Sequence, residues 1–165
     1  FNRNINKWDV SNVTNMEGMF SDCNNYNKSM KKWNVSNVTN MKLMFCSCVK
    51  FNKYIGNWNV SNVTNMEGIF SNCDKFNKDI SKWDVNSVTN IGWMFSNCYK
   101  FNQDISKWDI SNVTNMESMF YNCYEFNQNI NNWDINIPIK RKSIIGDCDI
   151  PEKDIDNKIN IYLHN

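Results

Sequence analysis

The sequence predicts an α/β repeat solenoid, in which 25-residue coils stack so that each coil covers the apolar side of its neighbour. One observation is a 25-residue spacing between successive tryptophans, which is kept without exception at Trp8, Trp33, Trp58, Trp83, Trp108 and Trp133. The other is that each repeat combines two apolar patterns, one with the spacing of a strand and one with that of a helix. Function is then expected on repeated surfaces and not in a catalytic cleft.

The part of the repeat around the tryptophan predicts one short strand. Trp8 and Val10 are two residues apart, and polar Lys7, Asp9 and Ser11 alternate with them. This alternation is typical of a strand with one buried face. We expect the strands of successive coils to pair into one parallel sheet.

The next part of the repeat predicts a short helix. Met16, Met19, Phe20 and Cys23 follow the spacing i, i+3, i+4, i+7, which is the apolar stripe of a helix about two turns long. The return loop carries an aromatic residue such as Tyr26, which we expect to fill the core. One short parallel strand and one short helix per 25-residue coil describe a leucine-rich-repeat-like solenoid.

An asparagine at a fixed slot is expected to stabilise the turn after the strand. Its side chain can bond the backbone of its own coil and of the adjacent one. The members of this column are Asn12, Asn37, Asn62 and Asn112, and Ser87 interrupts it.

The repeat resembles a known family. The unit from Trp108 to Met116, followed by Met119, Phe120, Cys123 and residues 126–130, is similar to the BspA-type leucine-rich repeat of bacterial surface proteins. That family includes mycoplasma surface lipoproteins and repeat proteins of giant DNA viruses. The resemblance covers residues 1–135 and implies a non-enzymatic surface or interaction module, often tied to adhesion, with no catalytic residues to carry over.

Two regions are expected along the chain: a solenoid of about five and a half repeats over residues 1–135, and a degenerate repeat with a C-terminal cap over residues 136–165. In the second region Pro138, Arg141 and Pro151 replace apolar residues of the repeat. Such a terminal repeat would protect an open end of the stack. Because the chain begins without Met and within a repeat, we expect it to be a fragment of a longer protein.

The cysteines are expected to be free thiols. Their shared slot is occupied by Cys23, Cys48, Cys73, Cys98, Cys123 and Cys148. This slot lies on the predicted helix, and packed helices are about 8 to 10 Å apart, which exceeds the span of a disulfide. Cys46 alone is out of phase, on the outward side of the helix, and is the thiol expected to react.

Composition argues against several classes of function. The 165-residue chain has a formal net charge of +1. This charge is too small to produce a positive electrostatic potential that would attract nucleic acid. No apolar run approaches the roughly 20 residues that span a bilayer. The one histidine, His164, lies next to the end of the sequence. We therefore do not expect catalysis or metal binding that depends on histidine. We expect no enzymatic activity, no metal and no cofactor.

Surface residues are therefore the candidate sites. The outward face of the sheet should present a charged plane of lysines beside aspartates, and the members we select are Lys32, Lys82, Lys107, Asp84 and Asp109. Trp93 and Tyr54 interrupt otherwise small or polar slots, and exposed aromatic residues are enriched in binding hot spots. The plain alternative is a solubilising face with isolated apolar residues.

Two hypotheses follow for function. The first is a module at the cell surface or outside the cell that binds a protein, or a glycan, through the sheet face and the variable helix positions. The second is a structural spacer or decoration component of a larger assembly such as a virus particle, in which the ends of the stack make the contacts.

Overall fold

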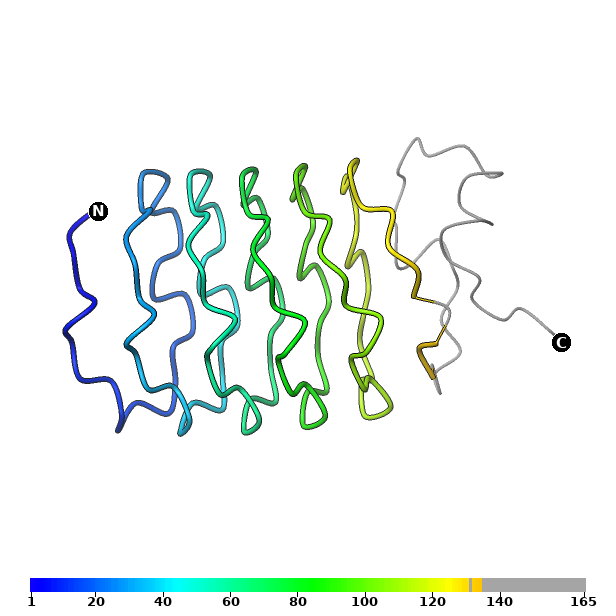
Figure 1. Ribbon diagram of the computed structural model, residues 1–165, viewed down its shortest axis with the longest axis horizontal. Helices are drawn as coiled ribbons and strands as arrows, with labels where there is room; N and C mark the ends of the chain where they lie inside the picture. The colour runs from blue at the N-terminus through cyan, green and yellow to red at the C-terminus, as the bar shows by residue number, and fades with distance from the viewer. Residues whose placement is uncertain (131, 135–165) are drawn as a thin grey trace, which may run out of the picture.

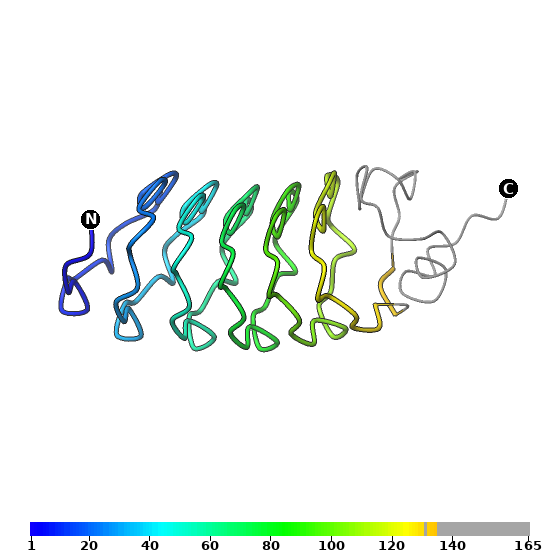
Figure 2. The same cartoon turned by 90° about the horizontal axis from the view of Figure 1, so that it is seen from above.

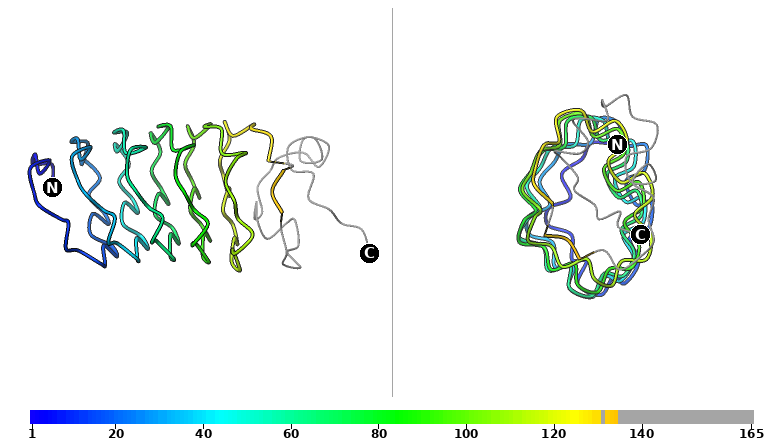
Figure 3. Two further views of the ribbon diagram at one scale, coloured as in Figure 1. Left: turned by 60° about the horizontal axis from the view of Figure 1, so that its bottom comes forward. Right: turned by 90° about the vertical axis from the view of Figure 1, so that its right-hand side faces the viewer.

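The computed structural model describes residues 1–130 and 132–134, which form a row of stacked coils (Figure 1). The row is elongated, and each coil closes into an oval when it is viewed along the stack (Figures 2 and 3). Equivalent residues of neighbouring coils are hydrogen-bonded, as when Thr39 N donates to Thr14 O at 2.8 Å. The 25-residue period is therefore the length of one coil.

The predicted helix is wrong, because the described residues contain no helix. Residues 16–23 form a run of turns instead, and we name this stretch and its equivalents (41–48, 66–73, 91–98 and 116–123) the turn segments. Within the first, Met19 N donates to Met16 O at 3.2 Å and Cys23 N to Phe20 O at 3.0 Å. Gly18 has a φ of 60°, which a helix does not allow and which suits the third position of a type II turn.

Alternate N–H groups of a turn segment bond to different partners. Met16 N donates to Asn40 O and Gly18 N to Lys42 O, both at 2.8 Å and both in the next coil. The intervening N–H groups bond within their own coil: that of Glu17 donates to Asn15 Oδ1 at 2.9 Å, and that of Met19 donates three residues back to Met16 O. A helix would use every N–H group internally, whereas this arrangement also joins the coils. It still buries residues spaced i, i+3, i+4 and i+7, which is why the sequence pattern resembles that of a helix.

The predicted strand at the tryptophan is also wrong, and with it the α/β class and its sheet. In the described part of the chain, the β-pairing consists of isolated parallel bridges that link Asn15, Asn40, Asn65, Asn90 and Asn115. Turns lie on both sides of the tryptophan, with Trp33 N donating to Met30 O and Val38 N to Val35 O. Too few extended residues remain between these turns to build a strand.

Side chains join the coils where the backbone does not. The indole Nε1 of Trp58 donates to Met30 O of the preceding coil at 3.2 Å. Asn37 Nδ2 donates to Ser11 O at 2.7 Å, which confirms that this asparagine column bonds the adjacent coil, although Asn37 is exposed. The same bond is made by Asn62 and Asn112.

A second asparagine column was missed in the sequence. Asn52 N donates to Asn27 Oδ1 and Asn77 N to Asn52 Oδ1, each at 3.0 Å. Each amide oxygen thus accepts from the backbone of the following coil, in the stretch between the turn segment and the tryptophan.

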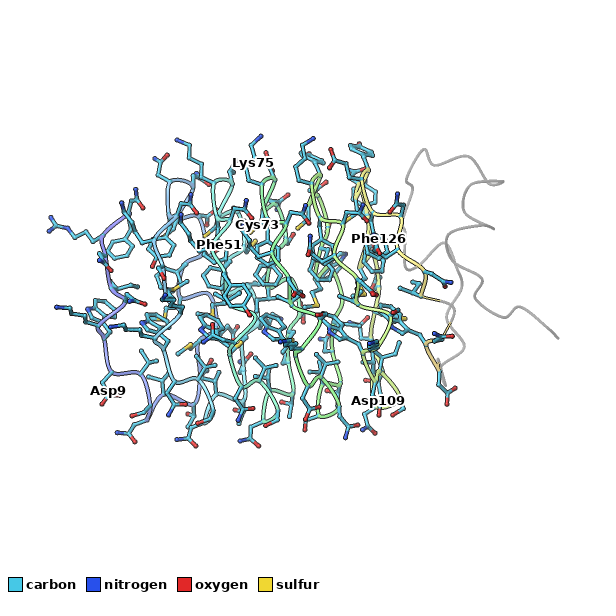
Figure 4. All side chains as sticks on the ribbon, viewed as in Figure 1. Asp9, Phe51, Cys73, Lys75, Asp109 and Phe126 are labelled. Carbon is cyan, nitrogen blue, oxygen red and sulfur yellow. The ribbon has the colours of Figure 1, made fainter. Side chains whose placement is uncertain are left out.

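Aromatic side chains fill the interior in continuous columns. Phe70 stacks on Phe45 and on Phe95 with ring centroids 5.9 Å apart in both pairs, and on Phe76 of the same repeat at 4.0 Å. Trp58 stacks on Trp33 at 6.3 Å. Phe51, Cys73 and Phe126 lie inside the outline of the coils in Figure 4. Adjacent coils therefore share one apolar core.

The described residues cover nearly all of the solenoid predicted for residues 1–135. The degenerate repeat and cap predicted for residues 136–165, including Pro138, Arg141, Pro151 and Cys148, lie outside the described residues.

Candidate interaction surface

The charged residues selected from the sequence are all exposed, but they do not lie on a sheet. These residues are Lys32, Lys82, Lys107, Asp84 and Asp109. Asp9 and Asp109 point outward from one rim of the stack, and Lys75 from the opposite rim (Figure 4).

The aspartates of this surface also stabilise turns. Asp109 Oδ1 accepts a hydrogen bond from Ser111 N at 3.0 Å, and Asp84 Oδ1 accepts one from Asn86 N at 3.2 Å. Hydrogen bonds from the Ser111 hydroxyl and then from its N–H hold the pKa of Asp109 below its usual value. An exposed carboxylate of this kind remains ionised at neutral pH and is poorly suited to general acid chemistry.

The buried cysteines are held by backbone carbonyls. Cys48, Cys73 and Cys98 are free thiols, and their Sγ atoms bond to carbonyls of the preceding coil; Cys73, for example, bonds to Phe45 O at 2.9 Å. The distance argument from packed helices was wrong, because residues 1–130 and 132–134 contain no helix and equivalent rings of adjacent coils are about 6 Å apart. Burial raises the pKa of Cys48 to about 12 and that of Cys73 well above its usual value. Cys46 is only half-buried.

Trp93 combines exposure with the left-handed backbone of its slot, which Leu43 and Ser118 share at φ values of 53° and 51°. Its side chain is 42% exposed, and its φ of 53° is in the left-handed region, where bulky residues are rare. Gly18 and Gly68 occupy the same slot in other coils, with φ values of 60° and 58°. The exposed side chain of Trp93 could be predicted from the sequence, but the positive φ of its backbone was not predicted.

Tyr54 lies in the stretch that precedes the tryptophan of its coil and is 45% exposed. Its ring packs against Gly56, where an added Cβ would lie 2.9 Å from the ring carbon Cε2. No hydrogen bond or ring contact among the described residues joins Tyr54 to Trp93. The structure therefore does not bring the two candidates into one site.

The surroundings of Trp93 are set by the residue before it. Position 92 is glycine, whereas the equivalent slots hold Glu17, Lys42, Glu67 and Glu117. The Asn115 amide occupies the space that a side chain at Gly92 would need, with its Nδ2 2.9 Å from the position of a Cβ. Trp93 N donates to Glu117 O of the next coil at 2.8 Å, so the backbones of these two residues lie side by side.

A pair of exposed tyrosines was missed. Tyr99 and Tyr124 are stacked with ring centroids 5.5 Å apart and an interplanar angle of 6°. Next to them along the chain, Lys100 and Glu125 form an ion pair. The signal in the sequence was the recurrence of tyrosine in two consecutive coils at a slot that earlier holds Asn24, Val49 and Asp74.

Among residues 1–130 and 132–134, no group of three or more His, Cys, Asp or Glu side chains is arranged to hold a metal ion. A search of the same residues finds no helix with the length and apolarity needed to cross a membrane.

The described part of the chain is thus a helix-free solenoid of 25-residue repeats with coil-to-coil variation on its surface. A family profile described as "Mycoplasma protein of unknown function, DUF285" matches residues 1–61 and 50–158. The chain belongs to this family of repeat proteins. Neither the curated proteins nor the solved structures contain a significant match.

Proposed function

We propose that this protein is a non-enzymatic interaction module that binds a protein partner through surface residues that vary from coil to coil, with Trp93 as the principal contact. The observation that carries the proposal is a bulky, exposed indole at a slot whose backbone is left-handed in every described coil and that holds Gly18, Leu43, Gly68 and Ser118 elsewhere. A left-handed backbone costs an L-residue about 1 to 2 kcal/mol. Because 42% of the side chain remains exposed, burial offsets this cost only in part. Leu43 and Ser118 adopt the same conformation, so the strain belongs to the slot, and what distinguishes Trp93 is its exposed indole.

The turn segment around Trp93 supports a preorganised contact. Trp93 N is bonded to the next coil at 2.8 Å, and Met94 N donates to Ile91 O at 3.2 Å within the coil. A backbone fixed in this way loses little conformational freedom when a partner binds. Tryptophan is also among the residues most enriched in hot spots.

A relationship to a family of surface proteins would give this activity a location. We propose kinship with the BspA-type repeat of surface proteins, because the 25-residue unit is similar, although the coil lacks the helix of a leucine-rich repeat. This kinship favours adhesion at the cell surface or outside the cell. Lys32, Lys82, Lys107, Asp84, Asp109 and Tyr54 would then serve as secondary polar and aromatic contacts.

The experiment compares the wild type with Trp93→Gly. Glycine is native at this slot in two other coils, so the variant should keep the fold. Fluorescently labelled proteins are incubated with intact epithelial cells, and bound protein is measured by flow cytometry. We expect binding that Trp93→Gly reduces at least tenfold and that prior trypsin treatment of the cells removes. If binding resists trypsin and is lost after glycosidase treatment, the partner is a glycan. Absent binding, or equal binding by the variant, contradicts the proposal.

A further inference from the structure

The charged residues of the turn segments are predominantly acidic. These segments contain the four acidic residues Glu17, Asp22, Glu67 and Glu117, and a single basic residue, Lys42. The lysine is already paired, because its Nζ lies 3.0 Å from Glu67 Oε1. A partner that meets this side of the stack therefore faces a local negative potential, although the whole chain is close to neutral.

Glu117 differs from the other glutamates of its slot. Glu67 also accepts a hydrogen bond from Asn90 Nδ2 at 2.9 Å, and Glu17 accepts one from Asn40 Nδ2 at 2.9 Å. The exposed carboxylate of Glu117 makes no hydrogen bond or ion pair with any described residue. Among the described residues, it is the glutamate of this column that has no side-chain partner.

The indole of Trp93 is also exposed, in the coil that precedes that of Glu117. It makes no ring stacking contact with another described aromatic side chain, unlike the buried tryptophans. Its backbone N–H bonds to the Glu117 carbonyl, and Gly92 adds no side chain beside it. An exposed indole and an exposed carboxylate thus belong to two residues of adjacent coils whose backbones are hydrogen-bonded.

We propose that Trp93 and Glu117 together bind an arginine side chain of the protein partner, an inference that rests on the proposed function. A cation over an indole face gains about 0.5 to 1 kcal/mol at an exposed site. The planar guanidinium group can stack on that face and donate two hydrogen bonds to a carboxylate at the same time. The ammonium group of lysine binds as a compact point charge and does not stack in this way.

The test uses acetyl-Gly-Arg-Gly-amide as the probe and the same peptide with citrulline, the neutral isostere of arginine, as its control. Binding is followed by the indole N–H resonances in ¹H–¹⁵N NMR spectra, in which Trp93→Gly identifies the Trp93 signal. We expect the arginine peptide to shift the Trp93 signal with a millimolar Kd. Binding should weaken about fivefold in Glu117→Gln, weaken at high salt, and be lost with the citrulline peptide.

A second control concerns Lys140, which lies outside the described residues. It follows Glu117 by 23 residues, as Asn90 follows Glu67. Lys140→Ala leaves both proposed contacts in place, so it should bind the arginine peptide as tightly as the wild type or more tightly. Equal shifts with arginine and citrulline, unchanged binding in Glu117→Gln, or loss of binding in Lys140→Ala would each overturn the arginine site. The proposed function would survive these results if Trp93→Gly still reduced cell binding, so the two failures are distinguishable.

Discussion

Replacement of Trp58 by alanine should be among the most destabilising single changes in the stack. Trp58 is 3% exposed, stacks on Trp33 and lies 6.3 Å from the ring of Phe45. Its indole also satisfies the Met30 carbonyl. Loss of a buried tryptophan costs about 3 to 5 kcal/mol, which lowers the folding equilibrium constant by about two to four orders of magnitude. Urea unfolding followed by far-ultraviolet circular dichroism measures this cost.

Trp8→Ala is the matched control for this experiment. Trp8 occupies the same slot but is 53% exposed. The burial that it loses is about half that of Trp58, so we expect a cost of about 1 to 2 kcal/mol. If the two variants lose equal stability, the tryptophan column does not contribute through burial between coils, and the reasoning is refuted.

Three further predictions concern single side chains. The Tyr26 hydroxyl is buried without a partner, and later coils have phenylalanine at this slot, so Tyr26→Phe should raise the free energy of unfolding by about 1 kcal/mol; a lower urea midpoint would contradict this. The pKa of Asp109 is lowered from 3.8 on folding, so its stabilisation is present above pH 3.8 and is lost as pH falls through the folded value. Asp109→Asn should remove this part of the acid sensitivity in pH-dependent unfolding, and an unchanged profile would count against it. Cys46 and Cys23 are half-buried while Cys73 is buried, so in a chain that carries Cys148→Ser, Ellman's reagent should modify the first two quickly; a fast phase that persists when both of these are also replaced by serine would contradict this.

The length of the coil and much of its interior could be predicted from the sequence. The tryptophan spacing gives the 25-residue coil, and the residues that share a slot with Phe70 and Trp58 are buried together. The same reasoning selected Trp93 and Tyr54 as exposed aromatic residues, which they are. These features could be predicted because burial depends mainly on the spacing of apolar residues.

The local backbone could not be predicted from that spacing. Met16 and Phe20 would lie on one side of a helix, but they also lie on one side of a run of turns. The missed signal was the recurrence of Gly18 and Gly68, with Asn72 four residues further on, at slots that have positive φ. Glycine and asparagine favour this conformation, and their repetition inside an apolar stripe argues against a helix.

The candidate site was predicted only in part, because its chemistry depends on contacts between coils. Glu117 and Glu67 share a slot, and the sequence alone does not show that the neighbours in which they differ are their bonding partners. The structure separates them, since Lys42 and Asn90 bind one carboxylate while the other has no partner among the described residues.

The alternation of hydrogen bonds in the turn segments has a consequence for how such proteins change in evolution. A single inserted or deleted residue would exchange the N–H groups directed along the stack with those directed within the coil, for the rest of that segment. Every later carbonyl partner would then be out of phase. Chain length should therefore vary by duplication or loss of whole 25-residue units, and diversity between relatives should accumulate as point substitutions at outward slots such as that of Trp93.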